Sequence, residues 1–190
     1  METWDAIRAR RNVREYAERT VAPEDLNRIL EAGRRSPSSM NEQPWDFVAV
    51  TERGRLVELA RVWQYGAHLG GAAAAIAFVA SVSDDPRQRE VVQFDMGQAA
   101  MSVMLAAADL GIGSCHSAIG DERLARETLG LPADRECTLL LSLGYPVDRP
   151  LVPIGRPARR PFDDVVHRER WQPEATAPGV AVRPPGPRPG

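Results

Sequence analysis

The chain has 190 residues, which is enough for one well-packed core, and one domain is the first expectation. A formal net charge of -2 and a pI near 6.0 give no overall attraction to nucleic acid or to an anionic membrane. No lysine occurs, so all 24 basic residues are arginine, and both a Schiff-base lysine and a Walker A lysine are excluded.

Cysteine usage and apolar runs predict the compartment. Cys115 and Cys137 lie in apolar surroundings without metal-ligand or CxxC spacing, which predicts buried free thiols in a reducing compartment. The first residues include an acidic side chain with no apolar run after them, so we expect no secretory signal. The longest apolar stretch, residues 72–82, is too short to span a bilayer. We therefore expect a cytoplasmic protein without membrane contact.

Periodicity and turn residues predict an alternation of helices and strands. Thr51 is expected to cap the third helix and Asp121 a later one. The helix at 88–110 is apolar on more than one face, which favours its burial at a subunit interface. The expected helices cover residues 4–11, 23 to the loop at 37, 51–63, 88–110 and 121–129, with a short helical turn within 162–171; the expected extended segments are 45–50, 72–82, 114–119 and 138–146, of which the last is the clearest central strand.

The Pro-, Gly- and Arg-rich end of the chain contains almost no large apolar side chain. We therefore predict one domain over residues 1–171 and a disordered tail over 172–190.

Residues 37–50 join polar loop chemistry directly to an apolar strand. Pro37 and Pro44 stop a helix, while Ser38, Ser39 and Asn41 favour turns because their side chains bond to nearby backbone. Such a rigid loop on a buried strand suits the binding of a planar polar ligand. A capped helix-to-strand connection without a ligand is the alternative.

Conventional catalytic patterns are missing from the sequence. The three histidines lack HExxH spacing, and the segment 111–116 has neither a complete dinucleotide fingerprint nor a GxSxG elbow. Cys115 and His116 are adjacent on an expected strand, so their side chains should point to opposite faces rather than form a dyad.

Two arginine groups remain, one at residues 10–14 and one at Arg159 and Arg160. The planar guanidinium group binds phosphate in a bidentate manner, and two distant segments could together hold a terminal phosphate. Solvated surface charge is the alternative interpretation.

The order of these motifs resembles the FMN-dependent nitroreductase family from about residue 7 to residue 171. The resemblance lies in Arg-Arg-x-x-Arg, then Pro-Ser-Ser-Met-Asn-Glu-Gln-Pro-Trp-Asp-Phe, Leu-Gly-Ile-Gly-Ser-Cys, Leu-Gly-Tyr-Pro and Arg-Arg-Pro-Phe-Asp-Asp-Val-Val-His. It implies an α+β fold with a central, mostly antiparallel sheet flanked by helices, in an intertwined homodimer that shares two FMN sites across its interface.

The resemblance also implies which residues bind the cofactor. The FMN phosphate and ribityl chain would contact Arg10, Arg11, Asn12 and Arg14, helped by Arg159 and Arg160; the flavin held mainly by the other subunit would contact Pro37, Ser38, Ser39 and Asn41; the reactive edge of the ring would face the backbone of Ala118, Ile119 and Gly120. The chain departs from the family in three places. Asn12 stands where serine is usual, His68 where some members have a lysine near the flavin, and His116 where an aromatic residue is frequent.

The implied activity is a ping-pong transfer of electrons from NAD(P)H through FMN to a nitroaromatic, a quinone or a similar small electron-poor acceptor, with no catalytic side chain and no metal, since the flavin carries the chemistry. Two alternatives stay open. One is a flavin-dependent oxidase or dehydrogenase that tailors a small metabolite, and the other is a flavin-binding module without turnover.

Overall fold

The computed structural model describes residues 1–171. The chain divides into two compact units, Met1–Gly155 and a second that begins at Arg156. The expected tail, residues 172–190, lies outside the described residues, and the single domain expected over residues 1–171 stays a prediction.

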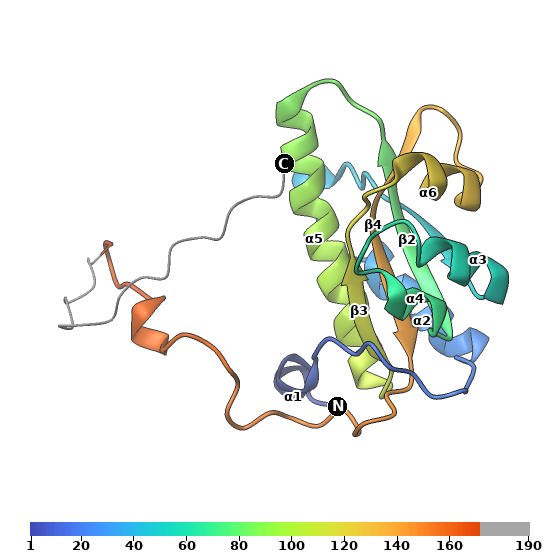
Figure 1. The fold of residues 1–190 in the computed structure, drawn as a ribbon. Coiled ribbons are helices and arrows are strands. Elements are labelled where there is room, and N and C mark those ends of the chain that lie inside the picture. The colour runs from blue at the N-terminus through green and yellow to red at the C-terminus, as the bar shows by residue number, and fades with distance from the viewer. Residues whose placement is uncertain (172–190) are drawn as a thin grey trace. The chain divides into compact units, whose positions relative to one another are not determined.

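Twelve helices and strands make up the described chain (Figure 1). Their order is α1 (Thr3–Ala9), α2 (Pro23–Arg34), η1 (Ser39–Asn41), β1 (Asp46–Val50), α3 (Arg53–Leu59), α4 (Ala67–Gly70), β2 (Ala74–Ser81), α5 (Pro86–Asp109), β3 (Gly113–Ser117), α6 (Glu122–Leu129), β4 (Arg135–Gly144) and η2 (Phe162–Asp164).

A four-stranded sheet in the order β1-β2-β4-β3 forms the centre of the first unit. Its three strand pairs are all antiparallel, and a single parallel bridge joins Asn12 to Ser114 on the outer edge of β3. The mostly antiparallel sheet flanked by helices confirms the expected α+β class. β4 is internal, as its run of leucines predicts.

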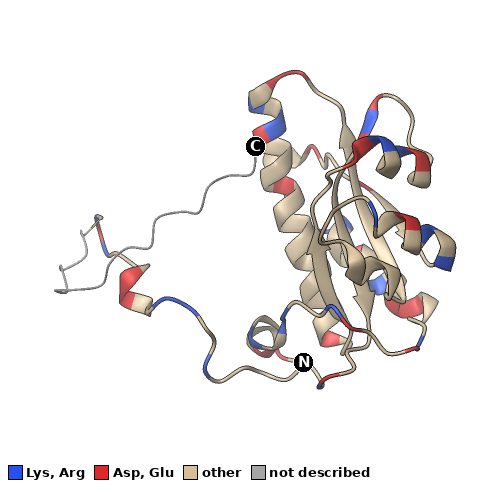
Figure 2. Ribbon diagram, in the orientation of Figure 1, with Lys and Arg blue, Asp and Glu red and all other residues tan. Residues whose placement is uncertain are grey.

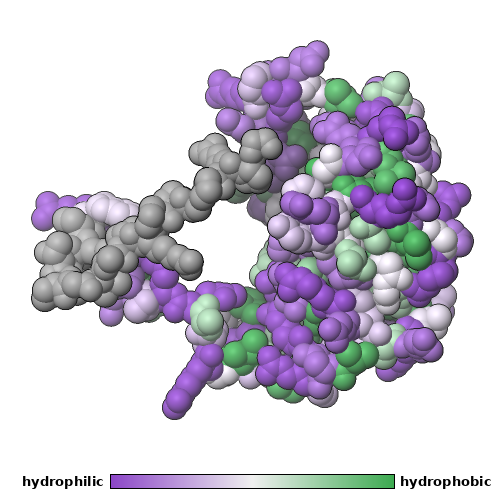
Figure 3. Space-filling view, viewed as in Figure 1, coloured by the Kyte–Doolittle hydropathy of each residue, from purple (hydrophilic) through white to green (hydrophobic). Residues whose placement is uncertain are grey.

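The two faces of the sheet carry different helices because alternate residues of each strand point in opposite directions. Ile76 and Phe78 of β2 face α2 and α5, where Ile29 and Val103 are fully buried. Ala75 and the other odd-numbered residues of β2 face the side that is covered by α3, α4 and α6. Figure 3 shows that the outer surface over these three helices is mostly polar, with small separate apolar groups.

The central helix α5 is long and has little charge beyond its first turns (Figure 2). Within residues 1–171 it is the one helix that is long and apolar enough to cross a membrane by length and composition, a test that core helices of folded proteins also pass. One side of α5 packs on the sheet, whereas Phe94 and Met101 on another side are 67% and 40% exposed.

Most expected elements lie within a few residues of their predicted bounds, but one cap was wrong. Glu52, not Thr51, caps α3, because its carboxylate accepts hydrogen bonds from the amides of Gly54 and Arg55 at 2.7 and 2.8 Å. A glutamate side chain two and three residues before the donating amides does what a threonine was expected to do. The expected Asp121 cap is confirmed, with Leu124 N donating at 2.9 Å.

Candidate functional site

The basic segment, defined as residues 10–14, lies along the edge strand β3. Val13 N donates to the carbonyl of Ser114 at 3.0 Å, next to the parallel bridge between Asn12 and Ser114. The Val13 side chain is buried against Ala9 of α1 and Ala108 of α5. This backbone pairing and burial fix the position of the arginines on either side.

The three arginines of the basic segment differ in their surroundings. Arg11 Nη2 donates to Asp148 Oδ1 at 2.6 Å and to the Arg149 carbonyl at 2.9 Å, so its charge is already countered. Arg10 Nη2 donates to Asn12 Oδ1 at 3.3 Å and approaches the sulfur of Met104 on α5 at 3.4 Å. Arg14 is exposed. An open hollow at this point is lined by Arg11, Asn12, Val13, Arg14, Glu15 and Asp148.

A buried hydrogen-bond network joins the basic segment to the sheet. Ser142 Oγ lies 2.6 Å from Tyr16 Oη and 2.7 Å from His68 Nδ1, and it also contacts the Cys115 carbonyl at 3.2 Å. Tyr16 Oη donates to the Val13 carbonyl at 2.6 Å. The two hydroxyls and the imidazole have one proton each for these contacts. The three shortest contacts are satisfied when Tyr16 donates to the Val13 carbonyl, Ser142 donates to Tyr16 and His68 Nδ1 donates to Ser142.

His68 belongs to this network, and its side chain is 6% exposed. Its pKa is lowered from 6.5, first by burial and then by the positive charges of Arg14 and His116. A neutral imidazole is therefore favoured. Whether it contacts a flavin, as the resemblance implies, stays a prediction. The neighbouring Cys115 is buried while His116 is exposed, which confirms that their side chains point to opposite faces.

Residues 118–120 follow β3 directly. The amides of Gly120 and Asp121 both donate to the Val62 carbonyl, at 3.0 and 2.9 Å, so the Gly120 amide is already engaged. Ala118 is exposed and Ile119 is half-buried. Of the three backbone groups expected to face the reactive edge, the amides of Ala118 and Ile119 thus remain the better candidates.

The polar loop at residues 37–44 has an unusual backbone. Met40, Asn41 and Gln43 have φ values of 51°, 58° and 51°, in the left-handed region that costs a non-glycine residue roughly 1 kcal/mol or more. Local bonds support the turn, since Ser38 O accepts from Asn41 N at 3.0 Å and Ser38 Oγ accepts from Gln43 N at 2.9 Å. Met40 is 93% exposed.

Two contacts attach this loop to α5. Ser36 Oγ lies 2.8 Å from Ser102 Oγ, and the Ser39 amide donates to both carboxylate oxygens of Asp95 at 3.1 and 3.0 Å. Ser39 Oγ also donates to Asp95 Oδ1 at 3.2 Å. Asp95 is 1% exposed and was missed from the sequence. It could have been noticed as the one charged residue in the apolar run 91–108.

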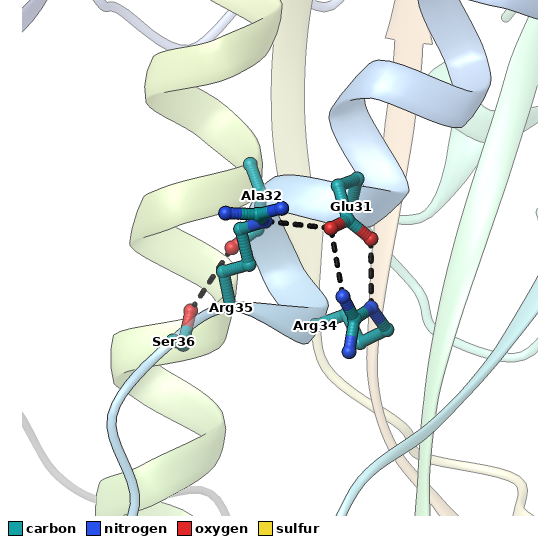
Figure 4. A network of polar contacts seen from close by, with 5 residues as sticks. All are labelled: Glu31, Ala32, Arg34, Arg35 and Ser36. Atoms are coloured by element: carbon teal, nitrogen blue, oxygen red, sulfur yellow. Dashed lines mark hydrogen bonds and ion pairs between the residues drawn. The ribbon is translucent and has the colours of Figure 1, made fainter.

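An exposed ion-pair cluster precedes the loop at the end of α2. Glu31 accepts from Arg34 at 2.7 and 2.8 Å and from Arg35 at 2.6 Å, and these two guanidinium groups lower the pKa of Glu31 to about 2 (Figure 4). Ser36, the next residue, donates back to the Ala32 carbonyl at 3.3 Å. The cluster lies in the last turn of the helix and its arginines are paired, so it adds no group to the site.

Arg159 and Arg160 lie in the second unit, where Arg159 Nη1 donates to the Ala158 carbonyl at 2.8 Å and Arg160 Nη2 to the Asp164 carbonyl at 2.9 Å. Their expected contact with a phosphate stays a prediction. Within residues 1–171 no group of three or more His, Cys, Asp or Glu side chains is placed to hold a metal ion.

Two groups of the expected site residues in the first unit, the basic segment and the polar loop, are attached to α5. The basic segment contacts Met104, and the polar loop contacts Asp95. Nine residues of helix at a rise of about 1.5 Å per residue separate these anchors by roughly 14 Å along the axis. One chain therefore does not bring the polar loop onto the basic segment.

Comparisons with known proteins agree with this fold and motif order. The family described as "Nitroreductase family" matches residues 7–68 and 60–145. A relative from Archaeoglobus fulgidus, provisionally named NADH dehydrogenase/NAD(P)H nitroreductase, is 34% identical over 169 residues, covering 87% of this chain and 96% of its own.

Two solved structures are also similar. One, titled FMN-dependent nitroreductase, from Clostridium difficile R20291, is 26% identical with a TM-score of 0.75, covering 87% of this chain and 98% of its own. The other, NADPH:FMN oxidoreductase from Vibrio harveyi complexed with NAD+, is 26% identical with a TM-score of 0.76, covering 88% and 77%. The motifs, the fold and these matches together place the chain in the nitroreductase family.

Proposed function

We propose that this member of the family is an FMN-dependent oxidoreductase that transfers electrons from NAD(P)H to a small electron-poor acceptor, such as a nitroaromatic or a quinone, in two successive half-reactions. When bound, FMN would supply the redox chemistry, namely hydride transfer from the nicotinamide and electron transfer to the acceptor. The protein contributes binding, orientation and electrostatics.

The basic segment carries this proposal. Arg10 and Arg14 lie beside β3 in a fixed backbone, and two guanidinium groups with the Asn12 amide form a donor set that suits a terminal phosphate. Arg11 already has a carboxylate partner in Asp148, so we assign it to the support of the segment rather than to the phosphate itself. Arg159 and Arg160 are further candidates for the same phosphate.

The reactive edge of the ring is assigned to the chain that follows β3. The amides of Ala118 and Ile119 can donate to a developing negative charge there, which is the usual way in which a backbone stabilises charge formed during a reaction. His68 remains neutral in its buried position, so it adds no positive charge to the site.

A complete site needs a second copy of the chain. The polar loop and the basic segment lie about 14 Å apart along α5, so the loop of one copy would contact the flavin held by the other. The exposed side of α5 supports such a dimer. Its residues follow at helical spacing and lack the charges that would oppose burial: Phe94, Gly97, Gln98, Met101 and Leu105.

The two free cysteines are both buried, and burial raises the pKa of Cys137 to about 12. Both thiols therefore stay protonated and inert, which supports the proposal that the protein works in a reducing compartment such as the cytoplasm.

The visible spectrum of the purified protein tests the proposed function. After incubation with FMN and removal of free cofactor, we expect about one FMN per chain, and we expect anaerobic NADH or NADPH to bleach it. A nitroaromatic or a quinone should then restore the colour. Protein that stays colourless would contradict the proposal, and a flavin bleached by a metabolite but by neither nicotinamide would favour the oxidase or dehydrogenase alternative.

A further inference from the structure

The carboxylate of Asp95 is buried in the middle of the apolar helix α5. It accepts most of its hydrogen bonds from one residue of the polar loop, Ser39. It accepts the Ser39 amide with both oxygens and the Ser39 hydroxyl with Oδ1, and Gln98 Nε2 donates to Oδ1 at 3.2 Å. Among the described residues it forms no ion pair. A buried charge costs free energy unless hydrogen bonds compensate it. These donors therefore stabilise the buried carboxylate, and the carboxylate fixes the positions of the donors.

The polar loop has one residue that bonds inward to α5 and two neighbouring residues that are exposed. Ser39 turns its amide and its hydroxyl inward to α5, so both are engaged within the chain. Met40 and Asn41, the next two residues, are exposed and have left-handed backbones. Strained residues of this kind persist where the surrounding contacts fix them. The inward bonds of Ser39 immediately precede the strained pair.

We propose that Asp95 is the positioning residue of the flavin site: by holding Ser39 it fixes the strained turn, so that Ser38 and Asn41 are presented to FMN in advance of binding. This inference rests on the proposed function, and it assigns Ser39 to the support of the loop instead of to direct contact through its side chain. Preorganisation of this kind raises affinity, because no binding free energy is lost to the entropy cost of ordering the loop.

The substitution Asp95→Asn tests the proposal with little change in shape. The asparagine amide group has a donor where the carboxylate had an acceptor, so it cannot accept the Ser39 amide with two oxygens. Two measurements are made on the full chain: the Kd for FMN, and the hydrogen exchange of residues 37–44 without FMN. We expect FMN to bind about tenfold more weakly or worse, and exchange in residues 37–44 to accelerate, since hydrogen bonds to a charged acceptor are lost.

Four further variants make the result specific. Glu90→Gln makes the same chemical change at an exposed position of α5 and should alter neither measurement. Gly130→Ala, at a φ of 67° in the end of α6, destabilises the fold away from the loop and should leave the Kd for FMN unchanged. Ser39→Ala should show a smaller effect than Asp95→Asn, and the double variant should bind FMN no more weakly than Asp95→Asn alone.

Three results overturn the proposal: an unchanged FMN affinity in Asp95→Asn, an unchanged exchange in residues 37–44, or an equal loss of affinity in Gly130→Ala, which would indicate general destabilisation. Failure of the proposed function looks different, because the wild-type chain itself would then bind no FMN while the exchange measurement would still report on the loop.

Discussion

Ser142 Oγ lies within 2.7 Å of two side chains, the phenol of half-buried Tyr16 and the imidazole of buried His68. Burial raises the pKa of Tyr16 and lowers that of His68, so both side chains stay neutral around pH 7. Three protons on neutral side chains satisfy the three shortest contacts of the network, which can hold the basic segment against β3 and β4. A proton added to His68 would place a charge in a buried position that already feels the positive charge of Arg14.

His68 should therefore make the stability of the fold depend on pH. Its folded pKa lies below 6.5, so below about pH 6.5 the unfolded chain binds more protons than the folded chain, and stability falls as pH falls. The slope from this one group is at most about 1.4 kcal/mol per pH unit. The variant His68→Asn keeps a donor near Ser142. Its unfolding free energy, measured with denaturant, should fall less between pH 7 and pH 5.5 than that of the wild type. Equal losses in the two proteins would contradict the assigned pKa.

At this scale the sequence predicted residue types better than it predicted partners. The arginines and the serines of the polar loop could be predicted as candidate site residues, and the opposed side chains of Cys115 and His116 could be predicted correctly, because each carries a local pattern. Asp95 stands out only as a single charge in an apolar run, and the partners of Asp95 and Ser142 could not be predicted, since each acts on a residue far away in the chain. Ser39 and Asp95 are separated by 56 positions, and no local spacing links them.

The N-terminal segment that contains Val13 and Tyr16 packs closely on the backbone of β3 and β4. A Cβ added to Gly144 of β4 would lie 2.7 Å from the Tyr16 ring, and one added to Gly113 of β3 would lie 2.6 Å from Val13. Glycine at these two positions allows the segment that carries Arg10–Arg14 to lie directly on the strands. The arginines depend on this docking for their direction.

Gly144→Ala should therefore weaken FMN binding, because it disturbs the packing of the N-terminal segment on β4. Overpacking of this kind typically costs about 1–3 kcal/mol, and the shift of Tyr16 would move the basic segment. We expect a lower unfolding free energy together with a higher Kd for FMN, measured by denaturant unfolding and by flavin titration. Gly71→Ala is the matched control, because a Cβ there meets no atom within 4 Å. Equal effects in both variants would show that the contact with Tyr16 is unimportant.

Helix and strand patterns sufficed for the elements because the residues that define them are close in sequence. Hydrophobic spacing after Pro23 predicted α2, and the leucine run of β4 predicted an internal strand. The cap of α3 was misassigned since Thr51 and Glu52 are adjacent and both can accept from the first turn. Sheet order was left open, because it depends on contacts such as those between β2 and β4, whose paired residues lie more than 50 positions apart.

At the scale of the molecule, α5 connects the two groups of residues that are proposed to bind FMN from different copies of the chain. It covers one face of the sheet, anchors the polar loop at Asp95 and contacts the basic segment at Met104, while its outer side remains apolar and exposed. A site whose two halves lie about 14 Å apart on one helix is completed most simply by a second copy packed on that outer side. Flavin retention and self-association should then be lost together.

Met101→Glu tests this link. Met101 is 40% exposed in a single chain, so the charge should be tolerated by the fold, but burial between two copies would leave it uncompensated at a cost of about 3–5 kcal/mol, applied twice by a two-fold axis. Light scattering should show the mass of a dimer for the wild type and of one chain for the variant, and the flavin absorbance per chain should fall with it. Val57→Glu introduces the same charge at a site on α3 that is 46% exposed, and it should change neither quantity. A wild-type chain that retains FMN as a monomer, or a Met101→Glu dimer with its full complement of flavin, would show that the outer side of α5 does not complete the site.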